Sequence, residues 1–201
     1  EEPAGKPIVL TSPKGGEKWG GGTTRNITWE TTGLNGVDHI RLLYSTDAGA
    51  TYPNLIIAST PNDGTHQWTV PDITSMATRV KAIAENISNS EIASDTSNTN
   101  FIIDNTGPTK PVVTDDGQTT SSTTQLHATW TASTDNETGV REYQYIIGTT
   151  PGGNDVRNWT SVLLNTQVTA VGLNLRDGKT YYFGVRAWNN ANLSSGIGVS
   201  D

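Results

Sequence analysis

The sequence comprises 201 residues, of which 33% are hydrophobic and 16% charged, and this length suits one large domain or two of about 100 residues. It contains no cysteine, which excludes disulfides, thiolate zinc sites and cysteine nucleophiles. Its 13 basic and 20 acidic residues give a net charge of -7, which argues against a nucleic-acid partner.

Alternation of apolar and polar residues predicts short strands throughout the first half of the chain. The runs are Asn26–Trp29, His39–Ser45, Gln67–Val70, Arg79–Ala84 and Asn100–Ile103. Turn residues such as Asn35-Gly36 separate them, and short strands spaced in this way are typical of a β-sandwich. The longest helix candidate, residues 75–91, has no coherent apolar stripe.

A break in this pattern follows at residues 104–111, which read DNTGPTKP and contain no apolar side chain apart from the prolines. Proline and glycine at this density are typical of a semi-rigid linker between domains. We therefore predict an immunoglobulin-like sandwich over residues 1–104, a linker over 105–111 and a second sandwich over 112–201. The fold class is all-β.

Alternation resumes in the second half. It predicts strands at Leu126–Trp130, Val140–Ile147, Gln167–Val171 and Tyr181–Ala187. No apolar run in the chain approaches the roughly 20 residues of a membrane helix, so we expect no membrane insertion. Glu1-Glu2-Pro3 is neither basic nor apolar and does not begin a secretory signal.

The second half resembles a fibronectin type III domain over about residues 108–201. The resemblance rests on Trp130 at the end of an early strand, on Tyr143 and Tyr145 in the next, and on the run LRDGKTYYFGVRAWN at 175–189. It implies that Trp130 is a core residue. It also implies that the Tyr181 hydroxyl bonds the backbone near residues 173–175, as in a tyrosine corner.

The first half resembles a prokaryotic immunoglobulin-like repeat over about residues 7–103. Its pattern is similar to the Ser-Thr-rich, glycosylphosphatidylinositol-anchored membrane protein family of fungal cell walls. The matching segments are IVLTSPKGGEKW at 8–19, NITW at 26–29, NDGTHQWTVP at 62–71 and DTSNTNFI at 95–102. Such repeats are accessory modules of secreted enzymes and surface proteins, and the resemblance supplies no catalytic residue.

These resemblances imply a non-catalytic pair of sandwiches in a larger secreted or cell-surface protein, acting as a spacer, structural or adhesion module. We expect the natural chain to continue past Asp201. The expected partners are neighbouring domains of the same protein and either a glycan or another surface protein. No cofactor is expected apart from the calcium considered below. Two alternatives stay open, a carbohydrate-binding accessory module of a polysaccharide-degrading enzyme and a self-assembling surface-layer or filament subunit.

Enzyme motifs are missing from the sequence. It has no Gly-x-Ser-x-Gly elbow and no His-Glu-x-x-His zinc pattern. His39, His66 and His127 each lie in a strand-like run without an evident partner, which favours a structural role. A hydrolase would need paired carboxylates in a cleft, which the sequence does not indicate.

Calcium binding is the strongest metal hypothesis, because calcium takes carboxylate, amide and carbonyl oxygens from acidic loops. Asp104 precedes the predicted linker, and Asp135 and Glu137 lie in an acidic loop of the second domain. The sequence predicts a calcium site at these three residues.

The aromatic residues divide into two groups. Trp29, Trp68 and Trp130 alternate with apolar residues in strands and are predicted to lie in the cores, whereas Trp19 and Trp159 fall in loops or at edges. An exposed aromatic ring can stack on a sugar. The predicted carbohydrate platform consists of Trp159, Trp188, Tyr182 and Tyr52.

The sequence contains Asn-x-Ser/Thr sequons, which are compatible with a glycosylated surface protein. They begin at Asn26, Asn86, Asn136, Asn158 and Asn192.

Overall fold

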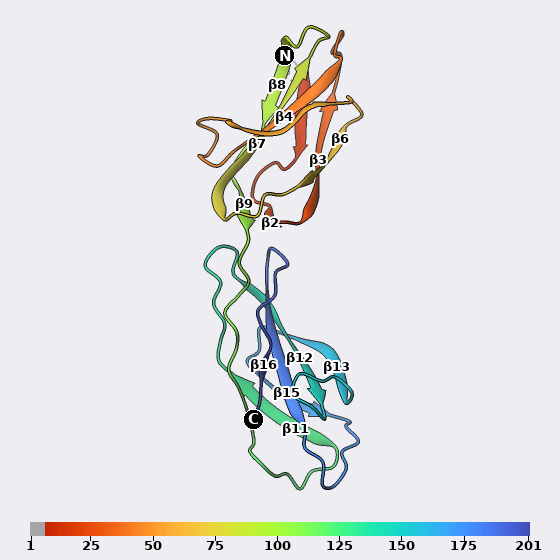
Figure 1. Cartoon of the computed structure of the whole chain (residues 1–201), viewed down its shortest axis with the longest axis vertical. Helices are drawn as coiled ribbons and strands as arrows, with labels where there is room; N and C mark the ends of the chain where they lie inside the picture. The colour runs from red at the N-terminus through yellow and green to blue at the C-terminus, as the bar shows by residue number, and fades with distance from the viewer. Residues whose placement is uncertain (1–6) are drawn as a thin grey trace, which may run out of the picture. The chain divides into compact units, whose positions relative to one another are not determined.

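The computed structural model describes residues 7–201, which form β-strands joined by turns and loops without a helix. The chain divides between Asn105 and Thr106 into two compact units, and each unit has its own sheets (Figure 1). Each unit also has its own hydrophobic core. The predicted all-β fold with two sandwiches is confirmed. No helix with the length and hydropathy of a membrane span occurs within residues 7–201.

Two sheets face each other in the first unit. The smaller sheet has the strand order β1-β3-β6, with β1 at Ile8–Ser12, β3 at Thr24–Thr31 and β6 at Thr65–Thr69. The larger sheet has the order β2-β9-β7-β4-β5, and β8 also pairs with β7. Its strands are β2 (Lys18–Gly20), β4 (His39–Ser45), β5 (Asn54–Thr60), β7 (Ser75–Glu85), β8 (Glu91–Thr96) and β9 (Phe101–Asp104). The β2–β9 pair is parallel, and the others are antiparallel.

The core of the first unit follows from the alternation of its strands. Val80, Ala82 and Ala84 on β7 point inward and are fully buried, as are Ile40 and Leu42 on the neighbouring strand β4. Large apolar residues of both sheets meet in one cluster. Burial of such side chains is the main force that stabilises a sandwich of this size.

The second unit repeats this plan with fewer strands. One sheet has the order β10-β11-β14, and the other has the order β13-β12-β15-β16. The strands are β10 (Val113–Asp115), β11 (Gln125–Trp130), β12 (Val140–Gly148), β13 (Arg157–Leu163), β14 (Gln167–Val171), β15 (Tyr182–Asn189) and β16 (Gly198–Val199). Its core gathers the inward residues of both sheets, including Tyr143, Tyr145 and Ile147 of β12.

Of the predicted linker, Asn105 belongs to the first unit and residues 106–111 belong to the second. The Thr109 amide donates to the Thr134 carbonyl at 2.9 Å, and the Thr134 amide donates to the Thr109 hydroxyl at 2.9 Å. Gly107 lies so close to the backbone of Ser194 that an added Cβ would be 2.4 Å from its carbonyl oxygen. Residues 106–111 are therefore fixed to the second unit by hydrogen bonds and close packing.

Candidate functional site

The outer face of the sheet β13-β12-β15 carries a cation held against two indole rings. Trp159 comes from β13, whereas Arg186 and Trp188 come from β15 and share one face because they are two residues apart. The guanidinium carbon of Arg186 lies 3.8 Å from the centroid of the Trp159 ring and 4.8 Å from that of Trp188. These separations are those of cation–π contacts.

A single glutamine oxygen fixes this arrangement. Gln144 on β12 pairs directly with Arg186 on β15. Its Oε1 accepts hydrogen bonds from Arg186 Nε at 3.1 Å, from Arg186 Nη2 at 2.8 Å and from Trp188 Nε1 at 3.1 Å. Removal from water lowers the pKa of Arg186, and the nearby Glu142 carboxylate partly opposes that shift.

Glu142 extends the network to the edge strand. It accepts a hydrogen bond from Ser161 Oγ on β13 at 2.5 Å and another from Gln144 Nε2 at 3.3 Å. The Ser161 bond is the largest cause that lowers the pKa of Glu142, with partial burial acting in the opposite direction and Arg141 assisting. The outer face is thus organised by its own side chains across three strands.

The four residues of the predicted carbohydrate platform do not all belong to the same unit. Trp159 and Trp188 lie on one face, but the Arg186 guanidinium covers part of each ring. Tyr182 is on the same strand as Trp188, at a position that faces the same side of the sheet. Tyr52 belongs to the first unit. Carbohydrate binding by these four residues stays a prediction.

Tyr52 lies in the hairpin that connects β4 to β5. In that hairpin, Asp47 accepts hydrogen bonds from Ser45 Oγ at 2.5 Å, from Thr51 Oγ1 at 2.6 Å and from the Thr51 amide at 3.0 Å. These bonds, the one from Ser45 foremost, hold the pKa of Asp47 far below its ordinary value. Partial burial raises the pKa of Tyr52. Its hydroxyl lies close to Gly49, where an added Cβ would be 2.9 Å away.

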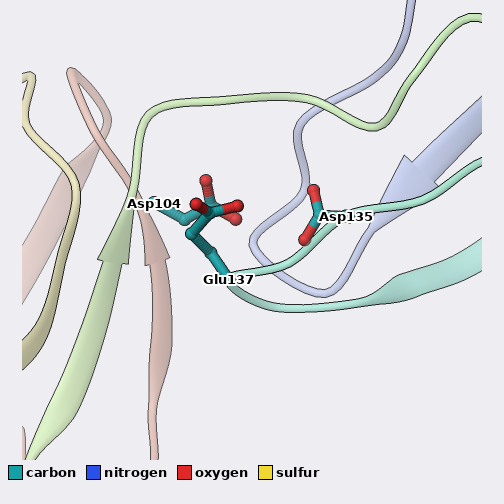
Figure 2. Close-up of side chains that lie close together, drawn as sticks. All are labelled: Asp104, Asp135 and Glu137. Atoms are coloured by element: carbon teal, nitrogen blue, oxygen red, sulfur yellow. The ribbon is translucent and has the colours of Figure 1, made fainter.

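The residues of the predicted calcium site belong to different units (Figure 2). Asp104 ends β9 in the first unit and is buried, whereas Asp135 and Glu137 lie in the loop that precedes β12. Calcium binding stays a prediction. A melting temperature that falls on addition of a chelator would support it.

Asp135 already accepts hydrogen bonds from its own loop. Its Oδ1 accepts from the amides of Thr138 and Gly139, each at 2.8 Å, and its Oδ2 accepts from Asn189 Nδ2 at 3.0 Å. Partial burial acts to raise the pKa of Asp135, but these hydrogen bonds outweigh it and lower the pKa. The Asp135 carboxylate therefore stabilises its own loop by accepting hydrogen bonds from the protein.

The tryptophans predicted to lie in the cores are buried. Trp29, Trp68 and Trp130 have exposed fractions of 2%, 6% and 6%, and Trp29 Nε1 donates to Asn62 Oδ1 at 3.0 Å. Trp19, expected in a loop or edge, lies on the edge strand β2 but is also buried, because its ring packs against Trp68 and Phe101 at centroid distances of 6.2 and 5.0 Å.

Tyr181 bonds the backbone of the preceding turn. Its hydroxyl oxygen accepts a hydrogen bond from the Arg176 amide at 2.8 Å, one residue beyond the segment expected from the family resemblance. The ring packs against the core of the second unit. This is the geometry of a tyrosine corner.

Two histidines have partners that the sequence pattern did not indicate. His39 is buried, with Nδ1 3.1 Å from Asp38 and Nε2 3.0 Å from Glu85, which also pairs with Arg41 at 2.8 Å. Glu85 lies opposite His39 in the β4–β7 register, so only the strand pairing could have revealed it. His127 Nδ1 lies 2.8 Å from Asp116 Oδ1.

The sequons lie on strands and turns of both units. Asn26, Asn136, Asn158 and Asn192 are exposed, and Asn86 is half-buried. The side-chain oxygen of Asn86 accepts hydrogen bonds from the amides of Ser88 and Ser90, which fixes the β7–β8 turn. Glycosylation at these residues stays a prediction.

No protein-family model matches the sequence, and no curated protein does. Among solved structures, the fibronectin(III)-like modules of Clostridium thermocellum CbhA match with a TM-score of 0.50 and 14% identity, over 96% of this chain and 91% of that one. The FN1-FN3 domains of chicken CNTN1 match with a TM-score of 0.57 and 16% identity, over 95% of this chain. Domains A168-A170 from titin match with a TM-score of 0.55 and 17% identity, over 98% of this chain.

The chain spans 64% of the length of the CNTN1 and titin structures. At these identities the likeness establishes the fold alone. The resemblance of residues 7–103 to the Ser-Thr-rich wall-protein family stays a prediction. The chain is a tandem pair of β-sandwiches with a fibronectin type III-like fold.

Proposed function

We propose that this chain is a non-catalytic spacer within a larger extracellular or cell-surface protein. The two fibronectin type III-like units would set the distance between neighbouring domains or present one of them. The extracellular location is supported by the family resemblances and by the sequons at exposed positions. An adhesive role would use the same architecture with a partner that binds one of the units.

The proposal rests on the anchoring of two consecutive residues, one in each unit. Asn105 is held in the first unit, where its Oδ1 accepts a hydrogen bond from Thr74 Oγ1. The next residue, Thr106, is held in the second unit, where its carbonyl accepts a hydrogen bond from Asn189 Nδ2 at 3.0 Å. Because anchored residues are consecutive, no stretch of free chain separates the units. A spacer that has no free chain between its units cannot lengthen by straightening such a segment when it is pulled.

A flexible insertion tests the proposal. A Gly-Ser-Gly-Ser-Gly segment between Asn105 and Thr106 adds free chain while leaving both anchors in place. We expect small-angle scattering to show a larger radius of gyration and a broader distance distribution for the insertion variant than for the wild type. The same segment inserted between the exposed residues Pro151 and Gly152 is the control for added mass. Identical distributions for the wild type and the Asn105–Thr106 variant would contradict a spacer without slack.

The carbohydrate-binding and self-assembling alternatives make different predictions. A self-assembling subunit should form larger species as its concentration rises, through pairing of exposed strand edges. Sedimentation velocity over a concentration series distinguishes it from a monomeric spacer. A carbohydrate-binding module should bind soluble glycans saturably.

A further inference from the structure

The second unit contains a cleft of about 700 Å³ between residues 115–123 and the turn at residues 175–181. This volume lies within the roughly 300–1,000 Å³ of cavities that bind small organic ligands. All of its walls belong to one unit, so the cleft is complete in that unit alone. Its position is distinct from the outer face that carries Trp159 and Trp188.

Hydroxyl and amide groups dominate its walls. Residues 119–123 contribute an unbroken run of threonines and serines, Thr169 lies on β14, and Gln118 adds an amide. Such groups both donate and accept hydrogen bonds, so they match a ligand rich in hydroxyls. The lining also includes Leu126 and Leu175, which add apolar groups. A lining that combines many hydroxyls with a few apolar groups suits a pyranose ring, which has hydroxyls at its edge and C–H groups on its faces.

A histidine adds a defined acceptor. His127 Nδ1 lies 2.8 Å from Asp116 Oδ1, and a carboxylate only accepts hydrogen bonds, so Nδ1 carries the proton. In the neutral ring, Nε2 is then an acceptor for a ligand hydroxyl. His127 sits opposite Thr169 in the β11–β14 register, which places the acceptor beside a hydroxyl.

The charge of the lining disfavours an anionic ligand. Carboxylates outnumber basic side chains around the cleft, and an acidic lining repels phosphate or sulfate groups. The acidic residues of the lining are Asp115, Asp116, Asp177 and Asp201, and the basic ones are Arg176 and Lys179. We propose that this cleft binds a neutral oligosaccharide, as a function additional to spacing.

The test uses the full chain with cellohexaose, xylohexaose and mannohexaose as separate probes in isothermal titration calorimetry. The His127→Ala variant removes the acceptor, and we expect it to weaken binding about tenfold, the equivalent of one hydrogen bond lost. The Thr169→Trp variant fills the cleft from an exposed strand position and should abolish binding. His66→Ala, a half-buried histidine on a strand of the first unit, is the matched control and should bind as the wild type does.

Three outcomes decide the proposal. Saturable binding of one probe, lost in Thr169→Trp and retained in His66→Ala, supports it. No saturable binding of any of the three probes at millimolar concentration overturns it. Binding that survives Thr169→Trp but is lost in Trp159→Ala overturns it as well, because the sugar would then lie on the outer face. Far-UV circular dichroism shows whether each variant keeps its sheets.

Discussion

The guanidinium carbon of Arg186 lies 3.8 Å from the centroid of the Trp159 ring, and the two residues come from strands separated by β12. This contact joins the edge strand β13 to β15 over the side chain of Gln144, which bonds the same guanidinium. The outer face of the second unit is therefore held by side chains as well as by backbone pairing. Its role in stability can be measured directly.

Replacing this cation should destabilise the second unit. Arg186→Met keeps an unbranched side chain that covers part of the same surface, but it removes the cation–π contacts and the hydrogen bonds to Gln144. We expect a loss of about 2 kcal/mol in the free energy of unfolding, measured by urea denaturation. A double-mutant cycle with Trp159→Ala should give a coupling of about 1 kcal/mol. Additive effects of the two substitutions would show that the contact contributes nothing.

A buried amide holds together three segments of the second unit. Asn189 is fully buried, and its Nδ2 donates to the Thr106 carbonyl and to Asp135 while its Oδ1 accepts from the amides of Ala191 and Leu193. Asn189→Asp removes both donors and places a carboxylate against Asp135.

We expect Asn189→Asp to cost roughly 3–5 kcal/mol of stability, the range for an uncompensated buried charge. Asn192→Asp is the matched control, because Asn192 is exposed and its Oδ1 accepts a hydrogen bond from Arg141 that a carboxylate can also accept. Thermal denaturation of both variants provides the comparison. Equal melting temperatures for the two would contradict the role of the amide.

Acid should weaken both units. The pKa values of Asp47 and Asp135 lie below the ordinary value of 3.8 in the folded chain. Each ionised carboxylate therefore contributes stability above that value, and the contribution is lost as the pH falls toward its folded pKa. We expect the melting temperature to decrease below about pH 4. Asp47→Asn should lower stability at neutral pH and make the acid loss smaller. If the melting temperature of Asp47→Asn falls with acid as much as that of the wild type, Asp47 does not contribute to the acid sensitivity.

The buried pair of His39 and Glu85 should be more important than the exposed pair of His127 and Asp116. Glu85 has an exposed fraction of 3%, so His39→Leu removes one partner of a buried carboxylate and leaves its ion pair with Arg41. We expect a loss of about 1–3 kcal/mol in the first unit. His127→Ala breaks a pair that is partly open to solvent and should cost less than about 1 kcal/mol. Similar losses in urea denaturation would argue against the difference in burial.

The sequence predicts the strands whose alternation is regular. The ranges His39–Ser45 and Gln167–Val171 agree with β4 and β14 at both ends, because one face of each strand packs on a core and the other is more open. Several strands were not predicted, namely β1, β2, β8, β10 and β16 and the two longer strands β5 and β13. The physical reason is clear for β5 and β13. Each lies at the edge of its sheet and has irregular pairing, so its burial pattern does not alternate cleanly.

Contacts between distant strands could not be predicted. Gln144 meets Arg186, and His39 meets Glu85, only through the registers of β12 with β15 and of β4 with β7. Apolar patterning sets which face of a strand is buried, but it does not specify which polar residues lie opposite each other on the other face. The cleft of the second unit depends on the path of residues 115–123, none of which the alternation pattern assigned to a strand.

Single-molecule force spectroscopy of the chain tests the central claim most directly, namely that two autonomous units are joined without free chain. Each unit contains on the order of 100 residues, so its unfolding should lengthen the chain by roughly 30 nm. We predict two such unfolding events and no extension at low force before the first. A single event that releases the whole chain, or a low-force extension that precedes both, would contradict a pair of independent sandwiches acting as a spacer.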